Sequence, residues 1–336
     1  MKNLFLSTAF VLFSISGFCQ ELTLDEIIDK GIALHDEGDY ESAIQMYEKA
    51  LEIDSTSSLA HYEMAFSYFN TKNYVKAEEH CRKSMALDDK NMMVSYIILG
   101  NSLDMQGKPE EAIEIFKEGI EQFDHYLLNY NYAITCFNTG DLDAAYDAIT
   151  AGIQMYDAHA GSHLILSQIM EKKGDRIKSM LPIYYFLLLE PNTERSETAY
   201  SRLLGFLDQG VEKSSEKNIN ISVPMNGDND FSAAEMMISM SRATNTLTEN
   251  KDKSALEHFA DNNQSIFTIL GELKKDKEGF WWEVYVPFFY DLTKSDIVEP
   301  FSYYISFTQG EEVIDWFDAN EEKLEKFNQF FNEEEN

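Results

Sequence analysis

A short motif that returns at a nearly constant interval constrains the fold of this chain more than any other feature. Its first copy starts at Gly38 and carries a small anchor residue, Ala43, followed four residues later by Tyr47. The anchor returns with steps of 34, 35, 33 and 34 residues, at Ala43, Ala77, Ala112, Ala145 and Ser179. A period near 34 with a helix–turn–helix pattern is typical of a solenoid of stacked helical hairpins.

Residue volumes within the repeat explain how two helices would pack in each hairpin. Small residues recur on the first helix, and large ones face them from the second. The small set is Gly31, Ala65, Gly100, Ala133 and Ser167, and the large set includes Tyr47, Phe116, Ile149 and Ile183. Glycines at 38, 107, 140 and 174 are predicted to end the first helices in a left-handed conformation. The second copy keeps the spacing but has Lys72 in place of that glycine.

These recurring positions, with Tyr40 and Tyr74 after the turn and Pro191 at the end, resemble the tetratricopeptide repeat (TPR) family over residues 24–193. The resemblance implies an all-α, right-handed superhelix of about five repeats, whose concave face is lined by first helices and commonly binds peptide segments. Residues 198–207 then read as a capping helix. The fifth repeat departs from the pattern, because Ser179 replaces the anchor alanine, Arg176 replaces an aromatic residue, and Pro182 lies inside the second helix.

Projecting the inward-facing positions of the first helices onto this chain predicts a groove rich in aromatic and amide side chains. The candidates are Tyr62, Phe66, Asn70, Asn101, Asp104, Tyr130, Phe137, Asn138 and Gln168. Amides can grip a peptide backbone because each offers a donor and an acceptor. No Lys or Arg occurs from Glu118 to Glu171, so a neutral or basic segment is favoured over a free carboxylate. In the alternative interpretation, these aromatic residues only cover the groove or contact the C-terminal region.

The periodicity fails at residues 209–231, which read as a linker, and helical signals return over 232–336. Residues 218–223 alternate like a short strand without a partner in view. The segment from Phe280 to Leu292 has seven aromatic residues in thirteen, at a spacing that predicts a buried helix interrupted at Pro287, with a strand as the alternative. This region looks like the C-terminal module of some exported bacterial TPR proteins of unknown role. Its aromatic residues also suggest an alternative function, binding of a glycan or another small molecule.

The first nineteen residues have the layout of a secretory signal peptide. Lys2 precedes an apolar stretch from Leu4 to Ile15, and cleavage after Cys19 is predicted. In the rival interpretation Cys19 is lipidated, but bulky Phe18 precedes it where lipoprotein signals carry a small residue. The mature protein is therefore expected to be exported, periplasmic or secreted, and soluble.

Composition and motifs argue against most chemistries. The formal charge of −32 is spread over the chain and offers no Lys/Arg cluster for nucleic acid. Phosphate loops, nucleophile elbows and HExxH motifs are absent from the sequence, so neither an enzyme nor a cofactor is expected. His159 and His163 could share a helix face, but no third metal ligand is evident. Asp228 and Asp230 do not match an EF-hand loop. Cys81 and Cys136 replace core residues in separate repeats, so no disulfide is expected.

Together these observations predict a signal peptide at 1–19, a TPR solenoid at 20–208, a linker at 209–231 and a smaller helical domain at 232–336. The predicted function is that of an interaction scaffold that holds a protein segment in its groove. The identity of that segment and the oligomeric state do not follow from the sequence.

Overall fold

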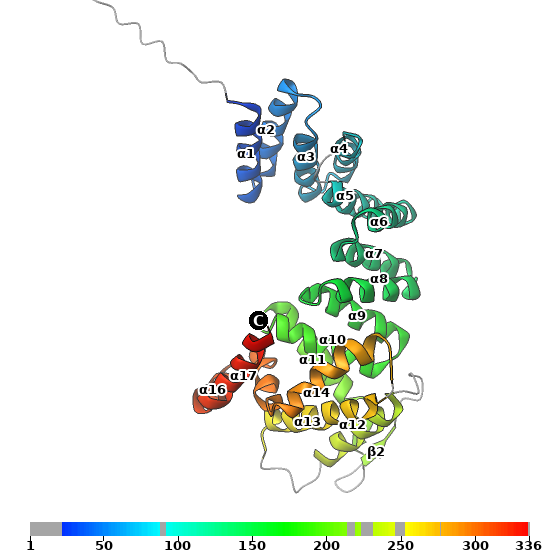
Figure 1. Ribbon diagram of the computed structural model, residues 1–336, viewed down its shortest axis with the longest axis vertical. Helices are drawn as coiled ribbons and strands as arrows, with labels where there is room; N and C mark the ends of the chain where they lie inside the picture. The colour runs from blue at the N-terminus through cyan, green and yellow to red at the C-terminus, as the bar shows by residue number, and fades with distance from the viewer. Residues whose placement is uncertain are drawn as a thin grey trace, which may run out of the picture. The chain divides into compact units, whose positions relative to one another are not determined.

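A computed structural model describes residues 22–87, 92–213, 219–222, 231–245, 253–275 and 277–334 (Figure 1). The predicted signal peptide, Cys19 and the pair Asp228 and Asp230 lie outside the described residues. The chain forms two compact units, residues 1–98 and 99–336, which divide within one helix.

The first unit contains two helical hairpins at the predicted positions. Its helices are α1 (Leu24–Asp36), α2 (Tyr40–Ile53), α3 (Ser58–Asn70), α4 (Tyr74–Ala86) and the start of α5 (Met92–Met105). Polar side chains begin the second helices, because Asp39 accepts a hydrogen bond from the Ser42 N–H and Asn73 accepts one from the Lys76 N–H. Such N-caps satisfy amide groups that the first turn leaves without a partner.

Close helix packing in each hairpin depends on the small residues that the repeat predicts. A Cβ atom on Gly31 would lie 2.4 Å from the Tyr47 ring, and one on Gly100 would lie 2.4 Å from the Phe116 ring. Tyr47 and Phe116 are both fully buried. The missing methyl group on the first helix therefore provides the space that the large side chain of the second helix occupies.

Lys72 shows that the turn geometry survives where the repeat loses its glycine. It has a φ of 62°, in the left-handed region, as Gly38 does at 84°. The same pair of backbone hydrogen bonds closes both turns: Lys72 N–H donates to Phe69, and Asn73 N–H donates to Tyr68. A residue with a Cβ pays a steric penalty in this conformation, so Lys72 is a strained position.

The second unit continues the hairpins and ends them with a single helix. After the end of α5 come α6 (Pro109–Phe123), α7 (Tyr126–Thr139), α8 (Leu142–Met155), α9 (Ala160–Lys173), α10 (Arg176–Leu189) and α11 (Glu194–Asp208). The predicted capping helix is thus α11, four residues longer at its start than expected. Pro182 lies inside α10, past its first turn.

The C-terminal region is helical apart from one short hairpin. Strand β1 (Val211–Lys213) pairs antiparallel with β2 (Ile219–Ile221), so the predicted strand has a partner that the sequence did not reveal. The helices that follow are α12 (Ser232–Asn245), α13 (Ala255–Lys274), α14 (Val286–Lys294), α15 (Val298–Tyr304), α16 (Glu311–Ala319) and α17 (Glu321–Glu334). A short 3-10 turn, Phe307–Gln309, links α15 to α16.

The aromatic segment that begins at Phe280 is helical, and the strand alternative is wrong. It starts as a π-helical turn, Trp281–Tyr285, in which the Val286 N–H donates to the Trp281 carbonyl five residues back. The turn leads directly into α14, whose first turn contains Pro287, a residue without a backbone N–H. The predicted interruption at Pro287 is therefore a widened turn just before the proline.

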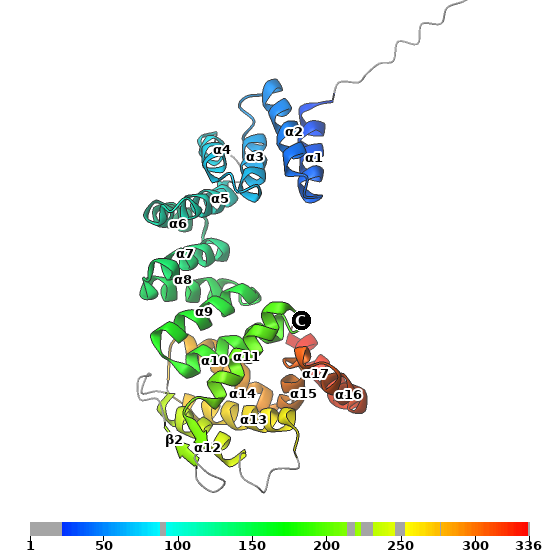
Figure 2. The same ribbon diagram turned by 180° about the vertical axis from the view of Figure 1, so that it is seen from behind.

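One hydrophobic core joins the last repeats to the C-terminal helices of the second unit. It runs from Ala133 on α7 to Phe327 on α17. Figure 2 shows α12 to α14 lying beside α10 and α11, in agreement with the contacts among these helices. Arg176 is 3% exposed and its guanidinium donates to the Gln209 carbonyl and Ser239, and pairs with Glu235 at 3.5 Å. This explains the departure of the fifth repeat at Arg176, because the residue ties α10 to α11 and α12.

A candidate peptide-binding surface

Three of the nine candidate residues lie on α3 in the first unit, and two of them, Phe66 and Asn70, contact other residues of that unit. Phe66 stacks on the His35 ring with 4.5 Å between centroids. The Asn70 amide donates to the Phe66 carbonyl at 3.1 Å and lies 3.3 Å from Nε2 of His35. His35 itself contacts Ser67 Oγ at 2.8 Å. The amide of Asn70 is therefore engaged within the unit, which leaves Tyr62 as the freest of the three.

The surroundings of Tyr62 are acidic. Burial raises the pKa of this half-buried tyrosine to about 12, and the neighbouring Glu63 adds to the effect. Burial also raises the pKa of Glu63 to about 7, with a further contribution from Asp36. Two carboxyl groups that repel each other beside an aromatic ring favour a cationic or neutral neighbour over an anion.

The other six candidates lie on first helices of the second unit. Asn101 and Asp104 are half-buried on α5, and Asp104 accepts a hydrogen bond from Thr135 of α7 at 3.1 Å. On α7, Tyr130 packs edge-on against His159, with 4.7 Å between ring centroids. Burial raises the pKa of Tyr130, so its hydroxyl stays protonated and can donate. Phe137 packs against the core and Asn138 is exposed.

Free amide groups distinguish this surface from that of the first unit. Asn101 on α5 and Gln168 on α9 are both half-buried, and no described residue forms a hydrogen bond with either side-chain amide. The side-chain amide of exposed Asn138 likewise forms no hydrogen bond with a described residue. A half-buried amide without a partner keeps a donor and an acceptor available for another molecule.

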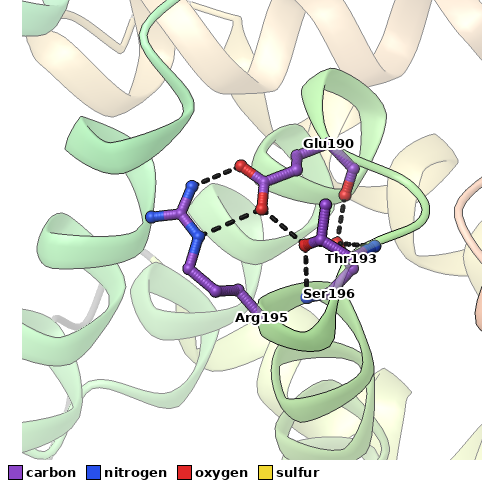
Figure 3. A network of polar contacts seen from close by, with 4 residues as sticks. All are labelled: Glu190, Thr193, Arg195 and Ser196. Atoms are coloured by element: carbon purple, nitrogen blue, oxygen red, sulfur yellow. Dashed lines mark hydrogen bonds and ion pairs between the residues drawn. The ribbon is translucent and has the colours of Figure 1, made fainter. Parts of the chain in front are cut away.

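Two arginines on α11 form ion pairs with glutamates of the repeat region, and the sequence pattern did not point to them. Arg202 forms an ion pair with Glu171 of α9, and Arg195 forms one with Glu190. Figure 3 shows Arg195 beside Glu190, whose carboxylate also accepts from Thr193 at 2.5 Å. The signal that could have found them is their spacing of seven residues on a helix interpreted only as a cap. Both charges are paired with glutamates, so neither is presented alone to a carboxylate ligand.

The aromatic residues proposed for glycan binding are inside the core. Trp281 and Trp282 are 5% and 3% exposed. The Trp282 ring stacks on Phe231 at 4.6 Å, and Trp281 stacks on Tyr146 of α8 at 6.4 Å. A ring that must stack on a sugar needs an open face, so this hypothesis loses its best residues.

The C-terminal aromatics contact the repeats at positions other than the nine candidates. In the described part of the chain, their ring contacts with the repeats and α11 involve Tyr146, His163, Tyr184, Tyr185 and Tyr200. Tyr184 is fully buried, and its hydroxyl donates to Asn263 of α13 at 2.6 Å. Among the described residues, no ring contact therefore supports the interpretation that the candidate aromatic residues hold the C-terminal region.

His163 is a structural residue. Its Nε2 lies 2.6 Å from the Asp157 carbonyl and its Nδ1 lies 2.5 Å from the Tyr285 hydroxyl, so both ring nitrogens are engaged. Among the described residues, no group of three potential metal ligands occurs. Cys81 and Cys136 are free and buried, as the repeat pattern predicts.

Comparison with known proteins identifies the repeats. Three family models match, described as TPR repeat over residues 31–72 and as tetratricopeptide repeat over 55–125 and 99–160. The repeat region is therefore a tetratricopeptide-repeat array, and the predicted fold class is confirmed. Repeats of this family generally mediate protein–protein interactions. No described helix combines the length and apolar character needed to cross a membrane.

Curated relatives share only a part of their length with this chain. A TPR repeat-containing protein of Methanocaldococcus jannaschii is 22% identical over 43% of this chain and 31% of its own length. Small glutamine-rich tetratricopeptide repeat-containing protein 2 of Saccharomyces cerevisiae is 30% identical over 25% of this chain and 24% of its own. Among solved structures, PilF of Pseudomonas aeruginosa is similar with 18% identity and a TM-score of 0.48, covering 55% of this chain and 89% of that one.

Proposed function

We propose that this chain is an exported, non-catalytic scaffold that binds a neutral or basic peptide segment on the first helices of its repeats. The observation that carries the proposal is the pair of half-buried amides, Asn101 and Gln168, that have no hydrogen-bond partner among the described residues. An amide placed in this way can satisfy a peptide N–H and C=O, and the half-buried ring of Tyr130 on α7 offers apolar contact area.

The preference for a neutral or basic segment rests on charge. The stretch from Glu118 to Glu171 has no Lys or Arg, and two arginines of α11, Arg195 and Arg202, are paired with glutamates. The formal net charge of −32 attracts cationic partners over long distances and repels anionic ones. For the same reason nucleic acid is not proposed as a partner.

A pull-down with matched variants tests the scaffold. Asn101→Ala/Gln168→Ala removes both free amides, and Gln154→Ala serves as the control because it deletes an exposed amide from the second helix α8. An envelope extract passed over wild-type and control baits should yield the same bound proteins, with their amounts reduced at least fivefold on the double variant. Equal recovery on all three baits would contradict binding through these amides.

Export has a separate test. Intact-mass measurement of the protein recovered from its natural host should give a chain that begins at Gln20, since cleavage after Cys19 is proposed. A mass that retains Cys19 with attached lipid would support the lipoprotein alternative, and a mass that includes residues 1–19 would contradict export by this signal.

A further inference from the structure

A cavity of about 570 Å³ lies in the second unit, away from the nine candidate residues, where the end of α10 meets α14, α15 and α17. Tyr185, Leu188 and Leu189 of α10 form one wall, and Phe288 of α14 and Tyr304 of α15 contribute to the rest. Small-molecule pockets typically enclose about 300–1,000 Å³ and are lined mainly by apolar and aromatic side chains. The cavity meets both conditions.

The aromatic walls are held in place by contacts with residues outside the cavity and by contacts with one another. The Tyr185 ring stacks on buried His163 at 4.4 Å, and its hydroxyl donates to Asp157 at 3.3 Å. Among the lining residues themselves, Phe327 packs against Tyr304 at 5.2 Å and against Phe331 at 4.9 Å between ring centroids. A pocket whose walls are already ordered loses little side-chain entropy when a ligand enters.

The lining of the cavity is uncharged. Acidic and basic residues make up 26% of this chain, yet none of the described residues that line the cavity is charged. The polar side chains at its edge include the amides of Asn328 and Asn332, which are exposed on α17. A charged ligand would lose hydration in this setting without gaining an ionic partner, whereas a neutral ligand would not.

We infer that this cavity binds an uncharged, ring-bearing small molecule. Its apolar body packs among the aromatic and leucine side chains, and a polar edge faces the Asn328 amide at the mouth. This assigns a ligand site to the C-terminal module that differs from Trp281 and Trp282, and it does not depend on peptide binding by the repeats.

A pair of dyes that share one ring system tests the inference. N-phenyl-1-naphthylamine is neutral, and 8-anilinonaphthalene-1-sulfonate carries the same rings with a negative charge. Asn328→Trp places an indole at the mouth of the cavity, and Gln329→Trp adds the same indole at the next, exposed position of α17, which does not line it. Far-ultraviolet circular dichroism and thermal unfolding show whether each full-length variant keeps the fold.

The neutral dye should bind wild type with one site per chain and at least tenfold more tightly than the sulfonate. Binding should weaken at least tenfold in Asn328→Trp and stay within twofold of wild type in Gln329→Trp. Equal affinity of wild type and a folded Asn328→Trp variant, or no binding of the neutral dye, would overturn the site. Equal affinity for both dyes, or full displacement by benzyltrimethylammonium at equal concentration, would overturn the uncharged class of ligand.

Discussion

The hydroxyl group of Tyr285 donates a hydrogen bond to Nδ1 of His163 across 2.5 Å, joining the π-helical turn of the C-terminal region to α9 of the repeats. The Asp157 carbonyl, 2.6 Å from Nε2, can only accept, so the proton of the neutral imidazole sits on Nε2. His163 is fully buried, and burial lowers its pKa to about 4. The ring is therefore neutral in the folded protein at pH 7.

This arrangement predicts that acid destabilises the second unit before most carboxylates are protonated. In the unfolded chain His163 takes up a proton near pH 6.5, but in the folded chain only near pH 4. Between these values the unfolded state binds more protons, so stability falls as pH falls, by up to about 3 kcal/mol for this residue. Urea unfolding from pH 7.5 to 4.5 should show this slope in wild type and a much shallower one in His163→Gln. Parallel slopes would contradict the assignment.

Helix packing predicts opposite effects for two glycine substitutions in the second unit. Gly100→Ala should destabilise by about 1–3 kcal/mol, because the new methyl group collides with the buried Phe116 ring. Gly205→Ala on α11 should stabilise by about 0.5–1 kcal/mol, since nothing lies within 4 Å of its Cβ position and alanine favours a helix. Equilibrium unfolding in urea measures both. A stabilising Gly100→Ala would contradict the packing described for this repeat.

The turn at Lys72 predicts that glycine stabilises the first unit. Lys72→Gly relieves the penalty of a left-handed residue with a Cβ, a gain of about 1 kcal/mol. Thermal unfolding should show a higher midpoint for Lys72→Gly than for wild type, and a lower one for Gly38→Ala, where the same conformation gains a side chain. A lower midpoint for Lys72→Gly would contradict a steric penalty at residue 72.

The buried pair of Arg176 and Glu235 predicts a loss of stability that depends on whether one partner or both are removed. Burial raises the pKa of Glu235 to about 7, while Arg176 opposes the shift. Arg176→Met leaves the carboxyl group buried without its cation and should destabilise by about 3–5 kcal/mol. Arg176→Met/Glu235→Leu removes both charges and should recover most of the loss in urea unfolding. A double variant no more stable than Arg176→Met would argue against the pair as the cause.

The sequence predicted the repeats well because each hairpin packs a small residue of its first helix against a large residue of its second helix. Gly31 and Tyr47 are linked by a volume rule that is visible in a single repeat, and its recurrence locates every helix from α1 to α10. The C-terminal region has no sequence repeat, so the contacts among its helices and strands could not be predicted from a pattern. The strand that includes Ile219 seemed isolated, although β1 lies only a few residues before it.

The candidate surface was predicted less well than the fold. Helix periodicity predicts Asn70 on the inner face, but it does not predict that the Asn70 amide contacts the Phe66 carbonyl and His35. Arg176 was seen as a departure from the repeat, and its buried partners on α11 and α12 come from outside the repeat frame. Such hydrogen bonds depend on distant segments that a local pattern does not contain.

We propose that Asn101 and Gln168 bind an extended segment of neutral or basic character. Twelve-residue peptides selected from a random library on the full-length protein provide the direct measurement, with affinities determined by fluorescence polarisation. Selected peptides should carry a net charge of zero or above, and Asn101→Ala/Gln168→Ala should bind them at least tenfold more weakly while Gln154→Ala binds as wild type. Acidic selected peptides, or unchanged affinity in the folded double variant, would contradict the claim.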